Sequence, residues 1–470
     1  MEHFEVLERI SNILKKYLLE QGQGSFLRYK DPAELREILR LEDSADGAGW
    51  PEIFQWIEKY LEYSVKTNHP TFVNRMWAGA NLPSILGEMV TAVSNTSSCT
   101  YESAPVSTLM EKYMIAEMLE LVGFTNGEGQ MTTGSSNANM LAMMSARNEM
   151  LPTVKTEGMF GQQDMYAFVS ADAHYSMEKA ANILGLGTAH LRKIAVKQTG
   201  EMDSVDLKTQ LQEVTEQGGL AFFVGATAGT TVRGAYDPLE ELLELRSRYP
   251  FWLHVDGAWG GAVVVSDRLK EKYLRGIDRV DSFTWDFHKM LGTALMCNIF
   301  LINRRNHTLG KVCGIGDSSY IFHEENINEV LDLGAVSLQC GRRVDSLKWF
   351  LDWKFFGKKG FAAHVERCLE LCRYAEKIVL EAKELERVLP RASFNVCFRY
   401  KTSEEEANRL NLALRTQLYH QGSSLVGYAY HGTTLFLRLL LAGHDLTEKD
   451  VESFFSQLIA AGKHLERGQS

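Results

Sequence analysis

The sequence lacks the patterns that mark membrane, secreted and repeat proteins. None of its 470 residues belongs to a run that approaches the roughly 18 consecutive apolar residues of a membrane span. The amino-terminal stretch MEHFEVLERISNILKKYLLEQ is charged and amphipathic, without the apolar centre of a signal peptide. We see no internal repeat and no low-complexity tract. We therefore expect a globular, cytoplasmic protein that does not bind membranes.

Cysteine is scarce, and its spacing suggests neither a disulfide framework nor a metal site. The seven cysteines are odd in number and include no Cys-x-x-Cys pair. Cys368 and Cys372 lie four residues apart on a probable helix, but no nearby pair of ligands completes a metal site. We expect reduced thiols, as is usual in the cytosol, and no bound metal.

Positive charge is also in deficit. Lys and Arg total 50 against 60 Asp and Glu, which gives a net charge of −10. This mild acidity argues against nucleic acid or an anionic membrane as the main partner. A hydrophobic content of 45% and a length of 470 residues predict a sizeable core divided over two or three domains.

What the sequence does have, between about 105 and 305, is an alternation of helix-like stretches and short apolar runs. The apolar runs are 166–170, 221–225, 251–255, 282–285 and 297–302. The helix-like stretches are 109–122, 136–150, 176–185, 204–217 and 238–248. Such alternation predicts an α/β fold with a mainly parallel sheet and helices on both faces. Ligands bind such sheets at the carboxyl ends of the strands.

The flanking regions differ from this centre. Residues 1–65 are predicted to be mostly helical, with too little core to stand alone, so they should pack on the rest or on a second subunit. Beyond 345 we expect a helix over 345–388, strands near 394–400 and 435–441, and helices over 403–421 and 446–464. Thr447 and Asp450 can cap the last helix. The predicted domains are therefore 1–65, 66–345 and a small α+β domain, 346–470.

Two residues near predicted strand ends suggest the chemistry. An apolar run ends at Asp256, and Lys289 follows 33 positions later, directly after His288. A carboxylate that keeps a ring nitrogen protonated and a lysine that forms an imine are what pyridoxal phosphate requires of a protein. Each residue alone has an ordinary interpretation, as a turn-capping aspartate and as an exposed lysine. If both face one pocket, the chain is a pyridoxal-phosphate enzyme.

Other polar positions also follow predicted strands. Gly134, Ser135, Ser136 and Asn137 open a helix and can bind a phosphate there, although such residues are also ordinary helix caps. His174 can stack on a flat ring.

Thr231 can orient the ring oxygen. The small residues Gly257, Ala258, Gly260 and Gly261 would let a ring lie close to the backbone. Taken singly, each of these signals is weak, and their common order along the chain is what favours the cofactor.

In that order the motifs resemble the group II pyridoxal-phosphate amino-acid decarboxylases, and within them the acidic-substrate branch. The matching segments run from about residue 65 to the end. They include 69–74, 100–106, 174–176, 228–231, 254–256, 258–261, 288–290, 339–342 and 395–398.

The resemblance implies a fold-type I architecture, like that of aspartate aminotransferase, with a seven-stranded sheet. It also implies a homodimer with active sites at the interface, clasped by the N-terminal helices. The reaction would be that of a carboxy-lyase of amino-acid metabolism, which converts glutamate, aspartate or cysteine sulfinate to the amine and CO2.

The resemblance also implies roles for the cofactor-binding residues. Lys289 would carry the cofactor as a Schiff base, and Asp256 would pair with the pyridine nitrogen. The remaining positions would be His174 and Ala258 on the two ring faces, Thr231 near the ring, and Ser135, Ser136, Asn137 and His288 at the phosphate.

Substrate positions follow in the same way. Arg438 would receive the α-carboxylate. Tyr320, on a catalytic loop around 313–325, would return a proton to the substrate carbon, which favours plain decarboxylation.

The chain departs from the family pattern at three places. Asp286 stands where the family usually has Asn, in Asp286-Phe-His-Lys289, and brings negative charge near the expected phosphate unless it is paired or turned away. Arg75 replaces a neutral amide and can bind an anionic side chain through a charge-assisted bond. Trp77 differs in bulk from the usual residue. The particular acid therefore stays open.

Several alternatives remain. An aromatic or other amino acid could be the substrate, or the same fold could support an aminotransferase, a desulfurase or an oxidative deaminase. A catalytically silent scaffold is favoured by Asp286 and opposed by the intact Lys289, Asp256, His174, Tyr320 and Arg438.

Overall fold

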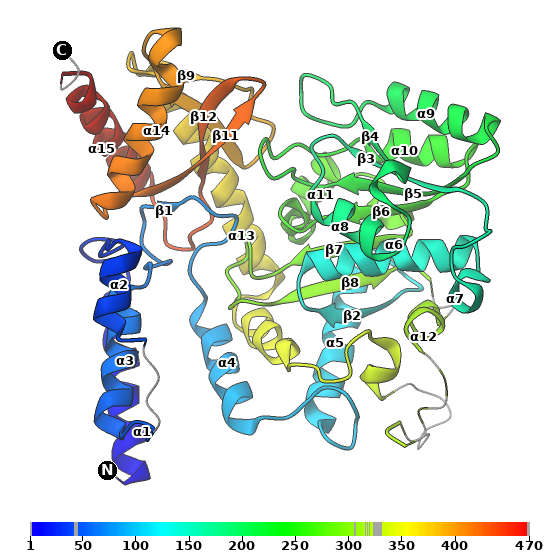
Figure 1. Cartoon of the computed structure of the whole chain (residues 1–470), viewed down its shortest axis with the longest axis horizontal. Helices are drawn as coiled ribbons and strands as arrows, with labels where there is room; N and C mark the ends of the chain where they lie inside the picture. Colours follow the sequence, from blue (N-terminus) through cyan, green and yellow to red (C-terminus); the bar gives the residue numbers. More distant parts are fainter. Residues whose placement is uncertain are drawn as a thin grey trace. The chain divides into compact units, whose positions relative to one another are not determined.

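The computed structural model divides into two compact units (Figure 1). It describes residues 2–41, 46–304, 307–314, 316, 318, 320–322 and 331–467. The large unit comprises Ala80–Glu370 and Arg391–Asn395. The small unit comprises Met1–Gly79, Leu371–Pro390 and Val396–Ser470, so it joins the two ends of the chain in one body.

A seven-stranded sheet forms the centre of the large unit. Its order is β2-β8-β7-β6-β5-β3-β4. The strands are β2 (Glu128–Thr132), β3 (Met165–Ser170), β4 (Leu191–Ile194), β5 (Leu220–Thr227), β6 (Trp252–Asp256), β7 (Ser282–Asp286) and β8 (Asn298–Ile302). Neighbours from β4 to β7 are parallel, and β8 is antiparallel to both β7 and β2. The predicted α/β class and mainly parallel sheet are confirmed.

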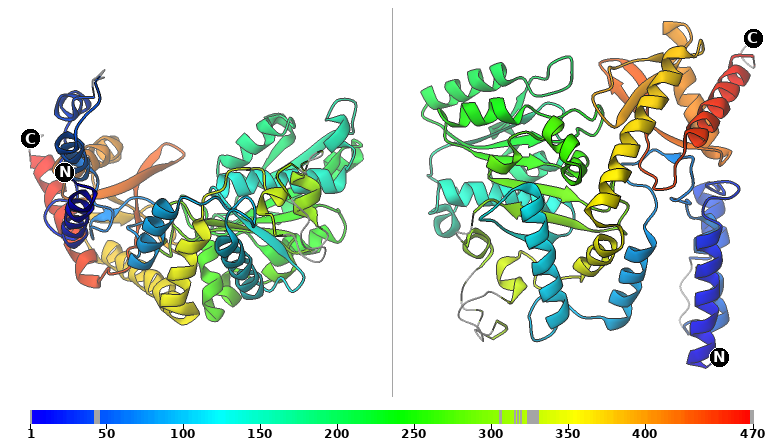
Figure 2. Two further views of the ribbon diagram at one scale, coloured as in Figure 1. Left: turned by 90° about the horizontal axis from the view of Figure 1, so that it is seen from below. Right: turned by 180° about the vertical axis from the view of Figure 1, so that it is seen from behind.

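Helices cover both faces of this sheet (Figure 2). The helices of the large unit are α4 (Leu82–Ser94), α5 (Pro105–Val122), α6 (Ser135–Met150), α7 (Val154–Glu157), α8 (Ser176–Ile183), α9 (Ser204–Glu216), α10 (Leu239–Arg246), α11 (Asp267–Tyr273) and α12 (Thr308–Cys313), with short 3-10 turns at Thr188–His190, Gly260–Val265, Ile277–Arg279 and Leu333–Val336. Helix α6 contacts β2 and β5 to β8, and α9 and α10 contact β5 and β6.

The central strands are buried on both faces because helices cover them. Every residue of β6, β7 and β8 is buried. Polar side chains on these strands are therefore removed from water and need partners inside the protein. This requirement shapes the site described below.

The small unit contains a five-stranded sheet in the order β1-β11-β12-β10-β9. The strands are β1 (Phe72–Val73), β9 (Leu385–Arg387), β10 (Asn395–Tyr400), β11 (Leu425–His431) and β12 (Thr434–Leu440). Strand β1 pairs in parallel with β11, whereas β11 and β12 form an antiparallel hairpin. Helices α14 (Glu404–His420) and α15 (Glu448–Arg467) pack against each other. The predicted cap of α15 is present, since Thr447 N–H donates to Asp450 Oδ2 at 2.8 Å.

Three N-terminal helices belong to the small unit: α1 (His3–Leu19), α2 (Pro32–Leu39) and α3 (Trp50–Tyr63). Asp31 caps α2 by accepting hydrogen bonds from the Ala33 and Glu34 N–H groups, directly before the proline that opens the helix. Helix α1 buries none of its side chains.

Helix α13 (Asp345–Glu381) contributes to both units and is interrupted at Gly357, whose φ is 62°. The predicted helix over 345–388 is wrong at its end, because β9 occupies 385–387. Within the described residues, no helix combines the length and apolar character needed to cross a membrane.

Candidate active site

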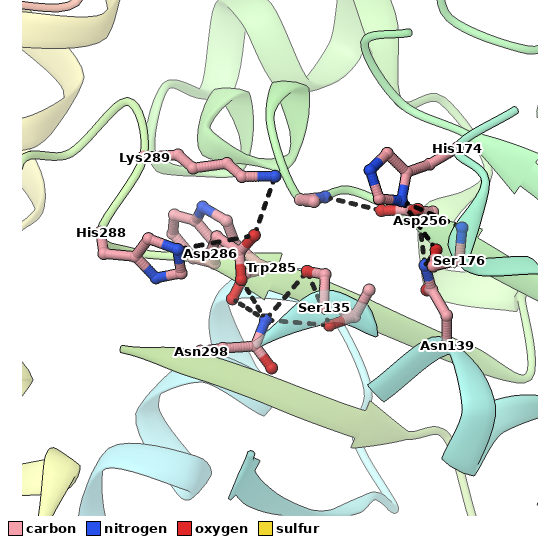
Figure 3. Close-up of polar contacts among 12 residues, drawn as sticks. Ser135, Asn139, His174, Ser176, Asp256, Trp285, Asp286, His288, Lys289 and Asn298 are labelled. Carbon is pink, nitrogen blue, oxygen red and sulfur yellow. Dashed lines mark hydrogen bonds and ion pairs between the residues drawn. The ribbon is translucent and has the colours of Figure 1, made fainter. Parts of the chain in front are cut away.

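The carboxyl ends of neighbouring strands bring the predicted residues together in the large unit. Strand β6 ends at Asp256 and β7 ends at Asp286, with Lys289 three residues further on. His174 follows β3, and Ser135 opens α6 after β2. Figure 3 shows Lys289 and Asp286 on one side of this edge and Asp256 with His174 on the other. The arrangement matches the location of ligand sites in parallel sheets.

The Asp256 carboxylate is 4% exposed and is held in a fixed orientation. Its Oδ2 accepts a hydrogen bond from Asn139 Nδ2 at 2.7 Å, and its Oδ1 accepts one from the Ala258 N–H at 3.1 Å. Within the described part of the chain, no salt bridge reaches Asp256. A buried carboxylate that lacks a cation is costly, and a pyridinium N–H supplies the missing partner. The site therefore fits pyridoxal phosphate.

Lys289 forms an ion pair with the unusual Asp286. Lys289 Nζ lies 3.0 Å from Asp286 Oδ2, and Asn298 Nδ2 donates to Asp286 Oδ1 at 2.6 Å. Burial alone would raise the pKa of Asp286, but the charge of Lys289 and the hydrogen bonds from Lys289 and Asn298 bring it below its ordinary value. Asp286 is thus a paired carboxylate, which answers the concern that the sequence raised.

His288 contacts the backbone of Cys297, the residue directly before β8. Its Nδ1 lies 2.7 Å from the Cys297 carbonyl oxygen and 3.1 Å from the Cys297 nitrogen. Its Nε2 lies 3.9 Å from Asp286 Oδ2. Burial lowers the pKa of His288, so the ring is neutral at neutral pH.

The start of α6 has the features expected of a phosphate-binding helix end. Gly134 precedes it with a φ of 108°, and a Cβ there would lie 2.6 Å from Met296 Cε. Ser135 is buried and its Oγ accepts from Asn298 Nδ2 at 3.0 Å. Ser136 is exposed and Asn137 is half-buried, so both can meet a ligand from solvent.

His174 is within electrostatic reach of the other charged groups. Burial lowers its pKa, while the charges of Asp256 and Asp286 raise it and that of Lys289 lowers it. Its Nδ1 lies 2.9 Å from Ser176 Oγ. The protonation of the His174 ring therefore depends on Asp256, Asp286 and Lys289.

The small residues after β6 serve the packing of the protein itself. A Cβ on Gly257 would lie 2.3 Å from Phe283 Cε2, and one on Gly260 would lie 2.4 Å from Tyr236 Oη. The sequence suggested that these glycines admit a flat ring, and the structure gives a different reason for them. Thr231 lies in a turn where its carbonyl oxygen accepts from Asn395 Nδ2 at 3.1 Å.

The remaining predicted residues belong to a partly described loop of the large unit and to the small unit. Tyr320 is 84% exposed, and part of the predicted loop 313–325 lies outside the described residues. Arg75, Trp77 and Arg438 lie in the small unit. Arg438 Nη2 donates to the Asn74 carbonyl oxygen at 3.1 Å, and the Trp77 ring packs on Phe72 with ring centroids 5.3 Å apart.

Sequence reasoning missed four residues that organise the site: Asn139, Ser176, His254 and Asn298. The spacing held a signal for two of them. Asn139 lies four residues after Ser135, on the same side of α6. His254 lies two residues before Asp256, on the same face of β6.

The fold and the lysine–aspartate site together define a pyridoxal-phosphate enzyme of fold type I. A family model described as the pyridoxal-dependent decarboxylase conserved domain matches residues 32–401. The chain therefore belongs to the pyridoxal-dependent decarboxylase family and is a carboxy-lyase that uses pyridoxal phosphate. The predicted family, cofactor and reaction class are confirmed.

Individual relatives span most of the chain. Cysteine sulfinic acid decarboxylase from Mus musculus is 35% identical over 93% of this chain and 91% of its own length. An acidic amino acid decarboxylase from Homo sapiens is 34% identical over 93% of this chain and 86% of its own. The crystal structure of mouse CSAD aligns with a TM-score of 0.92 and 32% identity, over 97% of this chain and 98% of that one.

Proposed function

We propose that the chain decarboxylates an acidic L-amino acid, namely glutamate, aspartate or cysteine sulfinate, to the corresponding amine and CO2. The observation that carries the substrate class is a pair of guanidinium groups in the small unit. Burial lowers the pKa of Arg438, and the nearby positive charge of Arg75 lowers it further. Arg438 also reaches the carbonyl of Asn74, the residue directly before Arg75. Two neighbouring cations favour a ligand with two anionic groups.

The names of the relatives support the same substrate class. Both are decarboxylases of acidic amino acids, and each aligns over 93% of this chain. In this proposal Arg438 binds the α-carboxylate and Arg75 binds the acidic side chain. Trp77 shapes the same substrate region through its contact with Phe72.

The site residues of the large unit would contact different parts of the cofactor. Lys289 would bond to it, Asp256 would hold its ring nitrogen protonated, and His174 and Ala258 would flank its ring. Thr231 would lie near the ring, and Ser135, Ser136, Asn137 and His288 would hold the phosphate. When bound, pyridoxal phosphate accepts the electron pair that the departing carboxylate leaves behind.

Proton transfer would fall to Tyr320 and Lys289. Tyr320 would deliver a proton to the substrate carbon after CO2 leaves, and Lys289 would displace the amine product. The exposed phenol of Tyr320 would have to approach the substrate for this step. His174 would position the substrate against the ring.

A substrate panel tests the proposal. Purified, cofactor-loaded protein is supplied with glutamate, aspartate, cysteine sulfinate, tyrosine or tryptophan, and CO2 and amine are measured. We expect turnover of one or more acidic substrates only, and Arg75→Gln should raise KM for them about tenfold through loss of a charge-assisted bond. Turnover confined to aromatic substrates would overturn the substrate class, and keto acid or hydrogen sulfide in place of CO2 would overturn the reaction.

We also propose a homodimer whose active sites lie at the interface. Helix α4 exposes a row of apolar side chains: Leu82, Leu86, Met89, Val90 and Val93. Val93 is 88% exposed, and a contiguous apolar face of this kind marks a protein interface. Met296 is also exposed and adjoins Gly134 at the start of α6, so an apolar side chain is exposed beside the expected phosphate site.

The dimer is tested by light scattering after size exclusion. The wild-type protein should have twice the mass of one chain, and Leu86→Glu should have the mass of one. Val205→Glu is the matched control, because Val205 is exposed on α9 away from that face. A wild-type protein with the mass of a single chain would contradict the proposal.

We propose a cytoplasmic location as well. None of the seven cysteines, all of which the structure describes, is part of a disulfide, as expected of a protein in a reducing compartment.

A further inference from the structure

A buried row of hydrogen bonds runs from the interior of the sheet to Asp256. Trp252 Nε1 lies 2.8 Å from Ser282 Oγ, which lies 2.8 Å from His254 Nδ1. His254 Nε2 lies 2.9 Å from Asn139 Oδ1, and Asn139 Nδ2 lies 2.7 Å from Asp256 Oδ2. His254, Asn139 and Ser282 have no exposed surface.

The chemistry of the two ends fixes the direction of every bond in this row. Trp252 Nε1 can only donate, and an ionised Asp256 can only accept. Asn139 must therefore turn its NH2 group to Asp256 and its Oδ1 to His254. His254 Nε2 then carries the ring's proton, and His254 Nδ1 accepts from the Ser282 hydroxyl. Each donor has an acceptor, with no conflict along the row.

The second N–H of Asn139 extends the row to His174. Asn139 Nδ2 donates to Ser176 Oγ at 3.0 Å, so the Ser176 hydroxyl proton is free to point at His174 Nδ1, 2.9 Å away. The Ser176 backbone N–H also donates to His174 Nδ1, at 3.3 Å. A nitrogen that accepts two hydrogen bonds carries no proton. In the neutral ring the proton therefore lies on Nε2, which points away from Ser176 (Figure 3).

We propose that His254 and Asn139 are positioning residues, which orient the Asp256 carboxylate and hold His174 in its Nε2–H form through one continuous row of hydrogen bonds. The inference rests on the proposed roles of Asp256 and His174 at the cofactor ring. It links the two groups, because the Asn139 amide donates one hydrogen bond to Asp256 and the other to Ser176, whose hydroxyl contacts His174 Nδ1. His254 acts by fixing which way that amide faces.

The burial of His254 agrees with this role. Its pKa falls to about 3 because the ring has no access to water. It therefore stays neutral and keeps one donor and one acceptor at working pH. A protonated ring would present two donors and would break the row at Ser282.

Three substitutions separate orientation from packing. His254→Gln keeps one donor and one acceptor, whereas His254→Leu fills similar space without either. Asn139→Asp has nearly the same shape as the native residue but loses both N–H donors and places a second carboxylate against Asp256. Cofactor affinity is measured by titrating each apo protein with pyridoxal phosphate and following its absorbance. Asp256→Ala is included as a reference.

We expect His254→Leu and Asn139→Asp to weaken pyridoxal-phosphate binding about tenfold or more, and His254→Gln to stay within about threefold of wild type. If His254→Leu and Asn139→Asp bind pyridoxal phosphate like wild type while Asp256→Ala does not, the row has no positioning role. The inference then fails, while the proposed role of Asp256 stands. If Asp256→Ala also binds like wild type, the proposed role of Asp256 fails first.

A measurement on the wild-type chain keeps the test independent of whether the variants fold. The ring nitrogens of 15N-histidine-labelled apo protein are observed by NMR, and His174 is assigned by comparison with His174→Asn. At neutral pH, Nε2 should carry the proton and Nδ1 should not. A His174 ring protonated on Nδ1 would overturn the inference.

Discussion

The Nζ of Lys289 and the Oδ2 of Asp286 lie 3.0 Å apart, so the reactive lysine is paired with a buried carboxylate three residues before it. The family usually has a neutral amide at this position. Bonding of the Lys289 amine to the cofactor would require it to leave this ion pair with Asp286. The ion pair therefore stabilises the apo protein in preference to the loaded one.

Asp286→Asn should consequently tighten pyridoxal-phosphate binding by about tenfold while it lowers the stability of the apo protein. The substitution removes the charge but keeps the shape of the side chain beside Asn298. Absorbance titration gives the affinity, and thermal unfolding of the apo protein gives the stability. Weaker cofactor binding by Asp286→Asn would show that the carboxylate supports the loaded state instead.

Lys289→Ala should abolish CO2 release and the absorbance band of the lysine-bound cofactor. Among the site residues that the structure describes, none other than Lys289 carries a primary amine. Lys208→Ala is the control, because Lys208 is exposed on α9. Wild-type turnover by Lys289→Ala would remove this lysine from the reaction.

Tyr320→Phe should uncouple the two products. Loss of the phenolic proton donor leaves CO2 release possible but slows return of a proton to the substrate carbon. We expect less amine than CO2. Equal amounts of amine and CO2 at the wild-type rate would assign the proton to another group.

The stability of the protein should fall in acid because of His254. Its native pKa of about 3 is below its ordinary value of 6.5, so below pH 6.5 the unfolded chain binds a proton that the native ring refuses. The stabilisation that comes from keeping His254 neutral in the native state is complete above pH 6.5 and is lost progressively as the pH falls towards 3. Between pH 7.5 and 5 the wild type should lose about 2 kcal/mol more free energy of unfolding than His254→Gln. Urea unfolding at both pH values measures the difference, and equal losses would contradict it.

Asp352 on α13 should be a major contributor to the stability of the large unit. It accepts hydrogen bonds from Asn81 Nδ2 at 3.1 Å, the Ser84 N–H at 3.0 Å and Thr293 Oγ1 at 2.8 Å. Burial raises its pKa to about 6, so the acid form is easily reached. Asp352→Ala leaves three buried donors without partners and should lower the free energy of unfolding by about 3 kcal/mol. Asp352→Asn should cost less than half as much, as measured by urea unfolding.

The sequence predicted the strands that are buried on both faces. Uninterrupted apolar runs mark such strands, and β3, β5, β6, β7 and β8 begin and end within one residue of the predicted runs, except that β5 ends two residues later, at Thr227. The strands that were missed, β1, β2, β4, β9 and β11, are short or carry polar residues. Strand β4 reads Leu-Arg-Lys-Ile, which has no signal apart from its pairing with β3.

The sequence predicted those site residues that stand in short motifs, but not the distant residues that orient them. Asp256 and Lys289 each stand in a recognisable motif, whereas the partners that orient them come from distant positions. Asn139 meets Asp256 across 117 residues, and Asn298 meets Ser135 across 163. Such contacts arise from the order of strands in the sheet, which no short pattern encodes. Conversely, the exposure of Tyr320 could not be anticipated from its motif.

Strand β1 has a consequence for how the chain is made. Phe72 pairs with Leu425, so an edge of the small sheet joins residues 353 positions apart, and the small unit draws on both ends of the chain. On the ribosome its first 79 residues must wait for the last segment to be synthesised, whereas the nearly continuous large unit can fold beforehand. During that interval Phe26, Phe72 and Val73 lack the contacts that later bury them. The nascent chain is therefore most prone to aggregation, and most dependent on chaperones, until the segment from residue 396 onward has been synthesised.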